Sequence, residues 1–141
     1  MEKYFLDTNI FLRVLIKEDN KVFKDCYQLL ERIKTNQIKA ATANIALAEI
    51  AWTLHSYYQF PKGEVVQAVK GILNLRGLRI IDSYEPFWAI EKFRQHNIKY
   101  IDALIASILI RQKSKWVIVS YDKDFDKIGA KRKEPGEIIN L

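Results

Sequence analysis

Short apolar runs alternate with longer segments of helical spacing along the whole chain. Tyr4, Phe5 and Leu6 form a strand-forming run, and a helical pattern begins soon after it, at residue 10. The expected strands are residues 4–6, 38–42, 78–81, 116–119 and 137–140, and the expected helices are residues 10–16, 20–34, 44–58, 62–75, 84–96 and 100–112. This alternation predicts an α/β fold, with a parallel or mostly parallel sheet covered by helices on both faces.

Local signals mark where several of these helices begin. Asn20 and Asn44 are the expected N-caps, because asparagine side chains accept hydrogen bonds from the free N–H groups of a first turn. Pro61 precedes the helix at residues 62–75, since proline is tolerated at a helix start and not in its interior. Cys26 lies in a helical pattern, and as the single cysteine it is expected to serve in packing, because it can form no disulfide within the chain.

Composition narrows the class of protein. The chain has 141 residues, 49% of them hydrophobic, and no linker rich in proline, glycine or serine divides it. We therefore expect a single domain, residues 1–141, with a sizeable core. The N-terminus has no apolar stretch after a basic region, and the most apolar run, residues 101–110, carries Asp102 and is too short to span a bilayer. These features predict a cytoplasmic protein that does not associate with membranes.

The formal net charge of +6 and the pI near 9.4 predict an anionic partner, with nucleic acid first among the candidates. Basic side chains are concentrated late in the chain, at Lys113, Lys115, Lys123, Lys127, Lys131, Arg132 and Lys133. A solvated surface beside a turn would explain this concentration equally well. We take Lys99, Lys123 and Lys127 as candidates for contacts with phosphate groups.

Two acids directly follow predicted strands. Asp7 ends the first apolar run, and Asp122 follows the strand at residues 116–119, with Ser120 between them. Ligands of open α/β sheets bind at the carboxyl ends of the strands, so both acids lie where chemistry is expected. The alternatives are local: Asp7 or Asn9 caps the helix that begins at residue 10, and Asp122 and Asp124 are turn formers.

Two further acids lie on apolar helix faces. Asp102 shares its face with Ile105 and Ala106, and Glu49 shares its face with Trp52, for which we expect a core position. A buried carboxylate is costly unless it is paired, hydrogen-bonded or bound to a metal. The alternatives are that Asp102 is an N-cap, and that Glu49 lies at an exposed edge or in a salt bridge made across the fold.

In a right-handed α/β fold these four acids, Asp7, Glu49, Asp102 and Asp122, can converge on one cleft. Clustered carboxylates raise one another's pKa, so the group needs a cation to remain ionised. Oxygen ligands favour Mg²⁺ or Mn²⁺, and no cysteine or histidine cluster at zinc spacing competes, because His55 and His96 are isolated and are expected at the surface or as capping residues. A basic protein with such a site suggests phosphodiester hydrolysis.

The chain resembles the PIN-domain ribonucleases and, among them, the small VapC-type toxins of toxin–antitoxin pairs. The resemblance rests on four segments in order: residues 5–9 (FLDTN), 44–49 (NIALAE), 100–106 (YIDALIA) and 120–125 (SYDKDF). It implies that Asp7, Glu49, Asp102 and Asp122 are the metal-site acids. It further implies that Ser120 supports the site and that Asn9 orders the first loop, while the role of Asp124 stays open.

The same resemblance implies a three-layer α/β/α sandwich around a five-stranded, mostly parallel sheet. It also implies Mg²⁺- or Mn²⁺-dependent cleavage of RNA, homodimerisation, and inhibition by a small antitoxin protein. One sequence feature accompanies the expected partner, a group of aromatic residues that belong either to the core or to a partner surface: Tyr57, Tyr58, Phe60, Phe87 and Trp88.

Three other functions would account for part of this pattern. A receiver-type signalling domain also gathers acids around Mg²⁺, but it would have an acidic pair after the first strand and a lysine after the last long strand, whereas this chain has Asp7 alone and Ser120-Tyr121-Asp122. A catalytically inactive RNA-binding module would gain nothing from four carboxylates facing its ligand. A housekeeping PIN nuclease shares the chemistry and differs in having no antitoxin.

Overall fold

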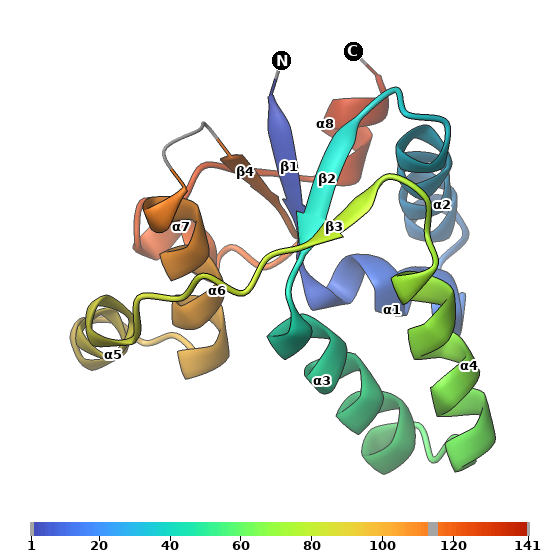
Figure 1. Ribbon diagram of the computed structural model, residues 1–141, viewed down its shortest axis with the longest axis horizontal. Coiled ribbons are helices and arrows are strands. Elements are labelled where there is room, and N and C mark those ends of the chain that lie inside the picture. Colours follow the sequence, from blue (N-terminus) through green and yellow to red (C-terminus); the bar gives the residue numbers. More distant parts are fainter. Residues whose placement is uncertain (1, 113–115, 141) are drawn as a thin grey trace.

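The computed structural model describes residues 2–112 and 116–140, and its centre is a sheet of five parallel strands (Figure 1). The strands are β1 (Lys3–Leu6), β2 (Lys39–Thr42), β3 (Leu78–Ile80), β4 (Trp116–Val119) and β5 (Arg132–Lys133), in the order β3-β2-β1-β4-β5. Strand β1 lies in the middle and pairs with β2 on one side and with β4 on the other. The carboxyl ends of these strands therefore meet at one edge of the sheet.

Helices cover both faces of the sheet, as predicted, so the α/β sandwich is confirmed. They are α1 (Thr8–Ile16), α2 (Asn20–Lys34), α3 (Asn44–Trp52), the π-helix η1 (Thr53–Tyr57), α4 (Lys62–Leu73), α5 (Pro86–Gln95), α6 (Tyr100–Arg111), α7 (Asp124–Lys127) and α8 (Pro135–Ile139). In Figure 1, α1, α2, α4 and α8 lie on one side of the strands, and α5, α6 and α7 lie on the other. Within the described ranges, no helix has both the length and the apolar character needed to cross a membrane.

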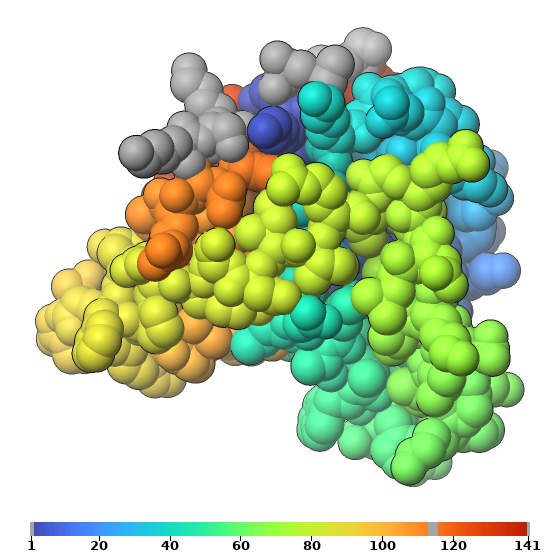
Figure 2. Space-filling view, viewed as in Figure 1, coloured from blue at the N-terminus to red at the C-terminus, as the bar shows by residue number. Residues whose placement is uncertain are grey.

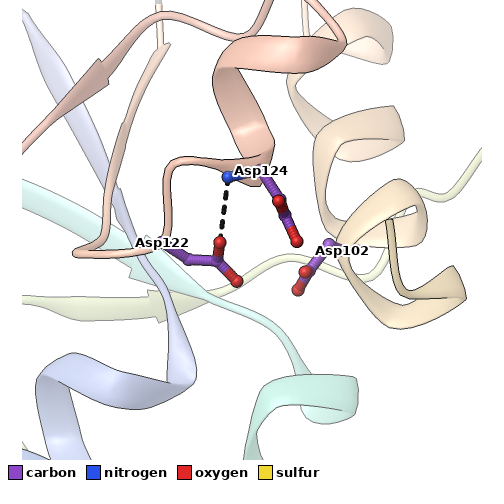
Figure 3. A group of neighbouring side chains, drawn as sticks. All are labelled: Asp102, Asp122 and Asp124. Carbon is purple, nitrogen blue, oxygen red and sulfur yellow. Dashed lines mark hydrogen bonds between the residues drawn. The ribbon is translucent and has the colours of Figure 1, made fainter. Parts of the chain in front are cut away.

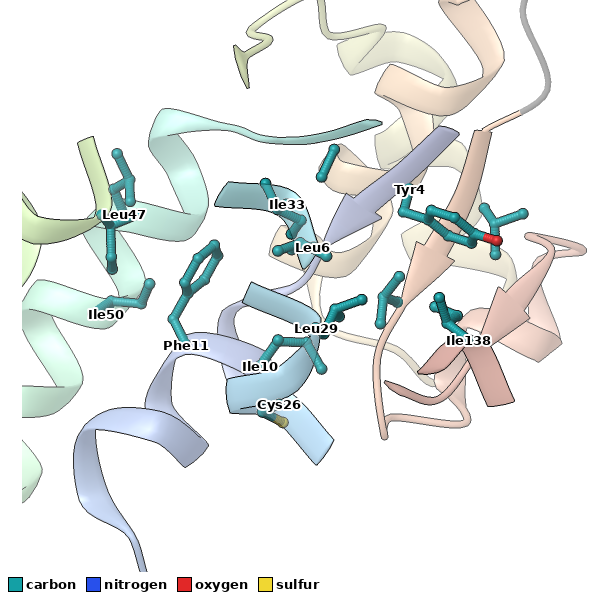
Figure 4. Packing of buried hydrophobic residues seen from close by; sticks show 14 of the residues in the cluster. Tyr4, Leu6, Ile10, Phe11, Cys26, Leu29, Ile33, Leu47, Ile50 and Ile138 are labelled. Carbon is teal, nitrogen blue, oxygen red and sulfur yellow. The ribbon is translucent and has the colours of Figure 1, made fainter. Parts of the chain in front are cut away.

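The alternation of side chains along β1 divides the core into two parts. Tyr4 and Leu6 point to one face and pack with Ile10, Cys26 and other residues of the larger cluster (Figure 4). Phe5 points to the opposite face and belongs to a second cluster with residues of α6 and α7. Cys26 is fully buried in the first cluster, so its expected packing role is confirmed.

The predicted last strand is wrong. Residues 137–140 were expected to be extended, but Ile138 and Ile139 are buried on α8, and the fifth strand is the short β5 just before it. The cause is a strong helix start. Pro135 occupies the first turn, the Glu134 side chain accepts a bond from a backbone N–H of that turn, and the Glu137 carboxylate accepts one from the Glu134 N–H at 3.2 Å.

Two of the predicted helix starts are also corrected. The N-cap of α2 is Asp19, whose carboxylate accepts a bond from the Val22 N–H, and Asn20 is the first helical residue. Asn44 is likewise the first residue of α3, and Ala43 before it has no capping side chain. The cap comes from a distant segment, because the Asn44 N–H donates to Asp82 Oδ1 at 2.9 Å. The long helix expected at residues 44–58 is split into α3 and η1.

Candidate metal centre

Asp7 and Ser120 lie side by side where the two central strands end. Leu6 is in register with Val119, and the Asp7 N–H continues the ladder by donating to the Val119 carbonyl at 3.0 Å. This pairing brings the Ser120 hydroxyl to Asp7, and it donates to Oδ2 at 2.6 Å. Parallel pairing of β1 and β4 thus joins two residues that are 113 positions apart in the sequence.

The Ser120 hydroxyl uses its full hydrogen-bonding capacity. Besides donating to Asp7, it accepts from Asn9 Nδ2 at 3.2 Å and from the Asp122 N–H at 3.0 Å. Because two donors already point at the hydroxyl oxygen, its own proton must go to the Asp7 carboxylate. Ser120 therefore fixes the position of Asp7, the side chain of Asn9 and the start of the loop that carries Asp122, and it is fully buried.

Asp7 is both a helix cap and part of a pocket. Its Oδ1 accepts from the Thr8 N–H at 2.8 Å, so the capping alternative describes a real contact. The same residue lines a pocket of about 190 Å³ together with Glu49, Asp102 and Asp122. The four acids reach this pocket from the end of β1, from α3, from α6 and from the loop after β4. In the space-filling view, the surface is indented between the part formed by α5 and α6 and the part formed by α3 and α4 (Figure 2).

Asp124 forms a compact group with two of these acids, Asp102 and Asp122. One carboxylate oxygen from each of Asp102, Asp122 and Asp124 lies within 4.8 Å of the others (Figure 3). The Asp124 N–H donates to Asp122 Oδ1 at 2.9 Å, which orders the turn that leads into α7. Asp124, whose role the sequence does not define, therefore belongs to a trio of carboxylates with Asp102 on α6 and Asp122 in this turn.

Asp102 is not an N-cap. The cap position of α6 is Lys99, and Asp102 lies in the first turn, 2% exposed, with its own N–H donating to the Lys99 carbonyl at 3.1 Å. Within residues 2–112 and 116–140, its Oδ2 is buried and has no hydrogen-bond partner. A buried carboxylate oxygen left in this state is costly, so the position fits a ligand that the protein itself does not supply.

Two further unpartnered oxygens belong to the same pocket. In the described parts of the chain, Thr8 Oγ1 and Asn9 Oδ1 are buried without a hydrogen-bond partner, and both residues line the pocket with Asp102. Apart from Leu12 and Lys99, the side chains that form the trio and line the pocket carry oxygen atoms, which suit hard cations such as Mg²⁺ or Mn²⁺ as ligands. The residues present therefore fit a divalent ion.

Burial governs the protonation of the two most enclosed acids. It raises the pKa of Asp7 to about 6, and the negative charges of Glu49 and Asp122 add to the rise, although bonds from Ser120 and the Thr8 N–H oppose it. Burial likewise raises the pKa of Asp102 to about 7, with further rises from Asp7, Asp122 and Glu49. Without a divalent cation, both carboxyl groups hold protons more tightly than ordinary aspartates do.

Glu49 has a cationic partner that sequence reasoning missed. Lys99 Nζ lies 3.7 Å from Glu49 Oε2, and the Glu49 side chain is 23% exposed at the rim of the pocket. The salt-bridge alternative for Glu49 therefore describes a contact that exists, and it exists inside the candidate site. Burial lowers the pKa of Lys99, but the charges of Asp102, Glu49, Asp122 and Asp7 outweigh this effect and raise it overall.

The other candidate phosphate contacts lie near the trio. Lys127 forms a salt bridge with Asp124 at 2.8 Å and also donates to the Asn97 carbonyl. Lys123 is exposed at the N-cap position of α7. Lys113 and Lys115, which contributed to the basic run in the sequence, lie outside the described residues.

Arg132 supports the same loop and was read from the sequence only as one member of a basic run. Its side chain is 13% exposed, and its guanidinium donates to the Ser120 carbonyl at 3.0 Å. It also forms salt bridges with Asp126 and Glu134, both at 3.1 Å. Arg132 thus fastens the segment that follows β4 to α7 and to the start of α8.

The expected core position of Trp52 is wrong, because 66% of this side chain is exposed. Helix α3 buries Ala46, Leu47 and Ile50, whereas the face that carries Glu49 and Trp52 opens toward the pocket and solvent. The expectation for the histidines is confirmed: His55 is exposed and close to the Phe60 carbonyl, and His96 is the C-cap of α5.

Comparison with known structures shows that other proteins share this fold. One chain of VapBC2 from Rickettsia felis, in a structure with a DNA fragment from the VapBC2 promoter, is 24% identical to this protein. The two superpose with a TM-score of 0.68, and the match covers 93% of this protein and 97% of that chain. Mycobacterium tuberculosis VapC20, a toxin that cleaves the sarcin-ricin loop, is 16% identical with a TM-score of 0.67, over 91% and 96%. VapBC-1 from nontypeable Haemophilus influenzae is 16% identical with a TM-score of 0.65, over 94% and 98%.

Comparison at the level of sequence gives two results. No curated protein matches the chain significantly. The PIN domain model, in contrast, matches residues 4–131, which include all the acids of the pocket and of the trio. The chain therefore belongs to the PIN domain family.

Proposed function

We propose that this protein is a metal-dependent endoribonuclease and the toxin of a VapBC-type toxin–antitoxin pair. The observation that carries the proposal is a pocket lined by four carboxylates, in which three buried oxygens have no hydrogen-bond partner among the described residues: Asp102 Oδ2 of one of these carboxylates, Thr8 Oγ1 and Asn9 Oδ1. Burying oxygens without partners is costly, and a cation bound among them would remove that cost. Membership of the PIN family and similarity to VapC structures support the nuclease and toxin assignments.

Asp102 and Asp122 would be the central ligands of Mg²⁺ or Mn²⁺, because they belong both to the pocket and to the trio with Asp124. Asp7 would complete the negative site, held in place by the Ser120 hydroxyl. A divalent ion bound there supplies an activated water and neutralises charge on phosphate oxygens. Glu49, at the rim of the pocket, can accept a proton from water that approaches the phosphate, which makes it the candidate general base.

RNA is the proposed substrate because the chain combines a net charge of +6 with a site of hydrolytic character. Lys99 lines the pocket, and Lys123 and Lys127 lie beside the turn that carries Asp122 and Asp124. Lysines in these positions can contact backbone phosphates on either side of the cleavage point. Binding of this kind depends on salt and is largely independent of sequence.

Protein partners form the last part of the proposal, a homodimer and a small antitoxin. VapBC structures and a toxin–antitoxin complex from Klebsiella pneumoniae are among the structures that share this fold. Trp52, Tyr57 and Phe87 expose 66, 72 and 90% of their surfaces, and large exposed aromatic side chains are typical of interfaces.

The ribonuclease proposal is tested by incubating the purified protein and its Asp102→Asn variant with mixed RNA and Mn²⁺, with and without EDTA. We expect cleavage only by the wild-type protein with free Mn²⁺. Cleavage that persists in EDTA or in the variant would overturn the metal mechanism. RNA binding without any cleavage would instead identify an inactive RNA-binding module.

The toxin proposal is tested by expressing the chain alone and together with the small open reading frame beside its gene. We expect growth arrest from the chain alone and relief when a copurifying complex forms. RNA cleavage by a protein that is harmless when expressed alone and has no copurifying partner would identify a housekeeping PIN nuclease.

A further inference from the structure

Lys99 brings a positive charge into the acid pocket. Among the described residues that line the pocket, it is the one with a cationic side chain, and its ammonium lies 3.7 Å from Glu49 Oε2. Its side chain is 61% exposed, so the ammonium stays at the mouth of the pocket and its stem can swing. A lysine ammonium is a compact charge with three donors on a flexible chain, well suited to exchange one oxygen partner for another.

The acids fall into two groups by their present partners. Asp102, Asp122 and Asp124 have oxygens within 4.8 Å of one another, and Asp102 Oδ2 has no hydrogen-bond partner among the described residues. Glu49 lines the same pocket but already has the Lys99 ammonium beside it. The first group suits a divalent ion, whereas an ion bound at Glu49 would have to displace a cation that the protein supplies itself.

The charges of the pocket favour the same division. Its lining carries the carboxylates of Asp7, Glu49, Asp102 and Asp122 and the single ammonium of Lys99. One divalent ion together with Lys99 leaves these side chains with a single net negative charge, and the Lys99 ammonium is the positive group that an entering phosphate can contact. A second divalent ion would lie close to the ammonium, and like charges in a half-buried site repel strongly.

We propose that Lys99 takes the place of a second metal ion. The centre binds one divalent ion at Asp102 and Asp122, and the Lys99 ammonium neutralises Glu49 until RNA binds and then contacts a phosphate oxygen of the substrate. This inference rests on the proposed ribonuclease function, since it assigns a role within the same site.

The backbone of Lys99 makes the test practicable. Its carbonyl accepts from the N–H groups of Asp102 and Ala103 at the start of α6, and these bonds do not depend on the side chain. Lys99→Gln should therefore fold normally while losing the charge, and Lys99→Arg should keep the charge. Lys62, an exposed residue at the start of α4, gives the matched control Lys62→Gln.

The primary experiment counts bound Mn²⁺ by electron paramagnetic resonance during titration of the metal-free protein to millimolar Mn²⁺. We expect one ion per chain in the wild type, in Lys99→Arg and in Lys62→Gln, and two in Lys99→Gln. The double variant Lys99→Gln/Glu49→Gln should return to one, because the second ion needs the freed carboxylate. Two ions in the wild type, or one ion in Lys99→Gln, would overturn the inference while leaving the ribonuclease proposal intact.

The second measurement is the dependence of kcat/KM on salt concentration. Losing one phosphate contact to a single strand should reduce the slope of log(kcat/KM) against log[salt] by about 0.7. We expect this reduction in Lys99→Gln, and an unchanged slope in Lys99→Arg and Lys62→Gln. An unchanged slope in Lys99→Gln would contradict the phosphate contact. A wild-type protein that binds no Mn²⁺ at all would instead refute the proposed function itself.

Discussion

The two sides of the acid pocket are built differently. On the side of β1 and β4, Asp7, Ser120 and Asp122 are tied together by hydrogen bonds of 2.6 and 3.0 Å, and the Ser120 hydroxyl has no bonding capacity left. On the side of α3, Glu49 has a lysine at 3.7 Å that is itself 61% exposed. One side is rigid before any ligand arrives, and the other can change partners.

This difference follows from what carries each acid. Asp7 extends the hydrogen-bond ladder between two central strands, which leaves its backbone no freedom. Glu49 lies on a helix whose first N–H is capped from a distance by Asp82 and whose end runs into the π-helix η1. We propose that the strand side would determine where a metal ion binds and that the helix side would adapt to substrate.

The largest expected effect comes from removing the charge of a proposed metal ligand, Asp102 on α6. Asp102→Asn keeps the shape of the side chain, and we expect it to lower kcat/KM by more than about 100-fold, the upper range for residues that only orient a metal ligand. At pH 7 the metal-free variant should also unfold at a higher temperature than the wild type, because a buried and poorly paired carboxylate has been removed. A decrease in both activity and stability would indicate misfolding instead.

A smaller effect is expected when the hydrogen bonds of the Ser120 hydroxyl are removed and the acids remain. Ser120→Ala removes the donor to Asp7 and the acceptor for Asn9 and the Asp122 N–H. We expect the affinity for Mn²⁺ to fall by about 10- to 100-fold. Ser120→Thr keeps the hydroxyl and serves as the control. Calorimetry that finds equal losses in both variants would attribute the effect to packing rather than to hydrogen bonds.

Glu49→Gln should lower the affinity for Mn²⁺ by less than about 10-fold, a smaller loss than that of Ser120→Ala. The reason is that the helix side is secondary for metal binding in the proposed site. The effect of Glu49→Gln on kcat is expected to exceed its effect on metal affinity, since Glu49 is proposed to act on water. A loss of affinity as large as that of Asp102→Asn would place Glu49 among the principal ligands.

Metal affinity should also depend on pH. The pKa values of about 6 for Asp7 and about 7 for Asp102 mean that these groups lose their protons late, so Mn²⁺ affinity should rise as pH increases through 6 and 7. The stability of the metal-free protein should change in the opposite direction. Raised folded-state pKa values favour folding fully below the unfolded value of 3.8, and this contribution is lost as pH rises through 6 and 7.

Thermal unfolding of the metal-free protein between pH 4 and 8 tests whether its stability decreases as pH rises. The wild type should lose stability across this range relative to Asp102→Asn, which retains Asp7 but has no carboxyl group at position 102 to ionise. Curves that run parallel for the two proteins would show that Asp102 titrates normally.

The smallest expected effect concerns the remote cap of α3. Asp82 accepts from the Asn44 N–H at 2.9 Å, and Asp82→Ala should reduce the free energy of unfolding by about 1 kcal/mol, the usual cost of losing a capping side chain. Asp82→Asn can still accept this bond and should cost less. Denaturant unfolding measures both variants, and an equal loss in the two would show that the charge matters more than the cap.

Local patterns were sufficient to predict four of the five strands and the acids that follow two of them. The short apolar runs at residues 4–6 and 116–119 identified the two central strands, and the acids that follow them line one pocket because parallel strands end at one edge of the sheet. Asp102 and Glu49 were recognised because a carboxylate stood on an apolar helix face, and both line the pocket.

The features that were missed depend on contacts between distant segments. The pairing of Lys99 with Glu49, the cap that Asp82 provides for α3 and the bonds of Arg132 to Ser120 each join residues from different elements, so no spacing along the chain reveals them. The helix at residues 135–139 differs, because Pro135 and the Glu134–Glu137 capping box were local signals that outweighed the extended reading of the final residues.

Diffraction from crystals grown with Mn²⁺, recorded at a wavelength where manganese scatters anomalously, shows directly whether one divalent ion binds at Asp102 and Asp122. We expect one strong anomalous peak per chain, within about 2.3 Å of carboxylate oxygens of Asp102 and Asp122. Lys99 should remain beside Glu49 in the absence of RNA. A pocket without a peak under saturating Mn²⁺, or a peak bound by Glu49 and not by Asp102, would contradict this expectation.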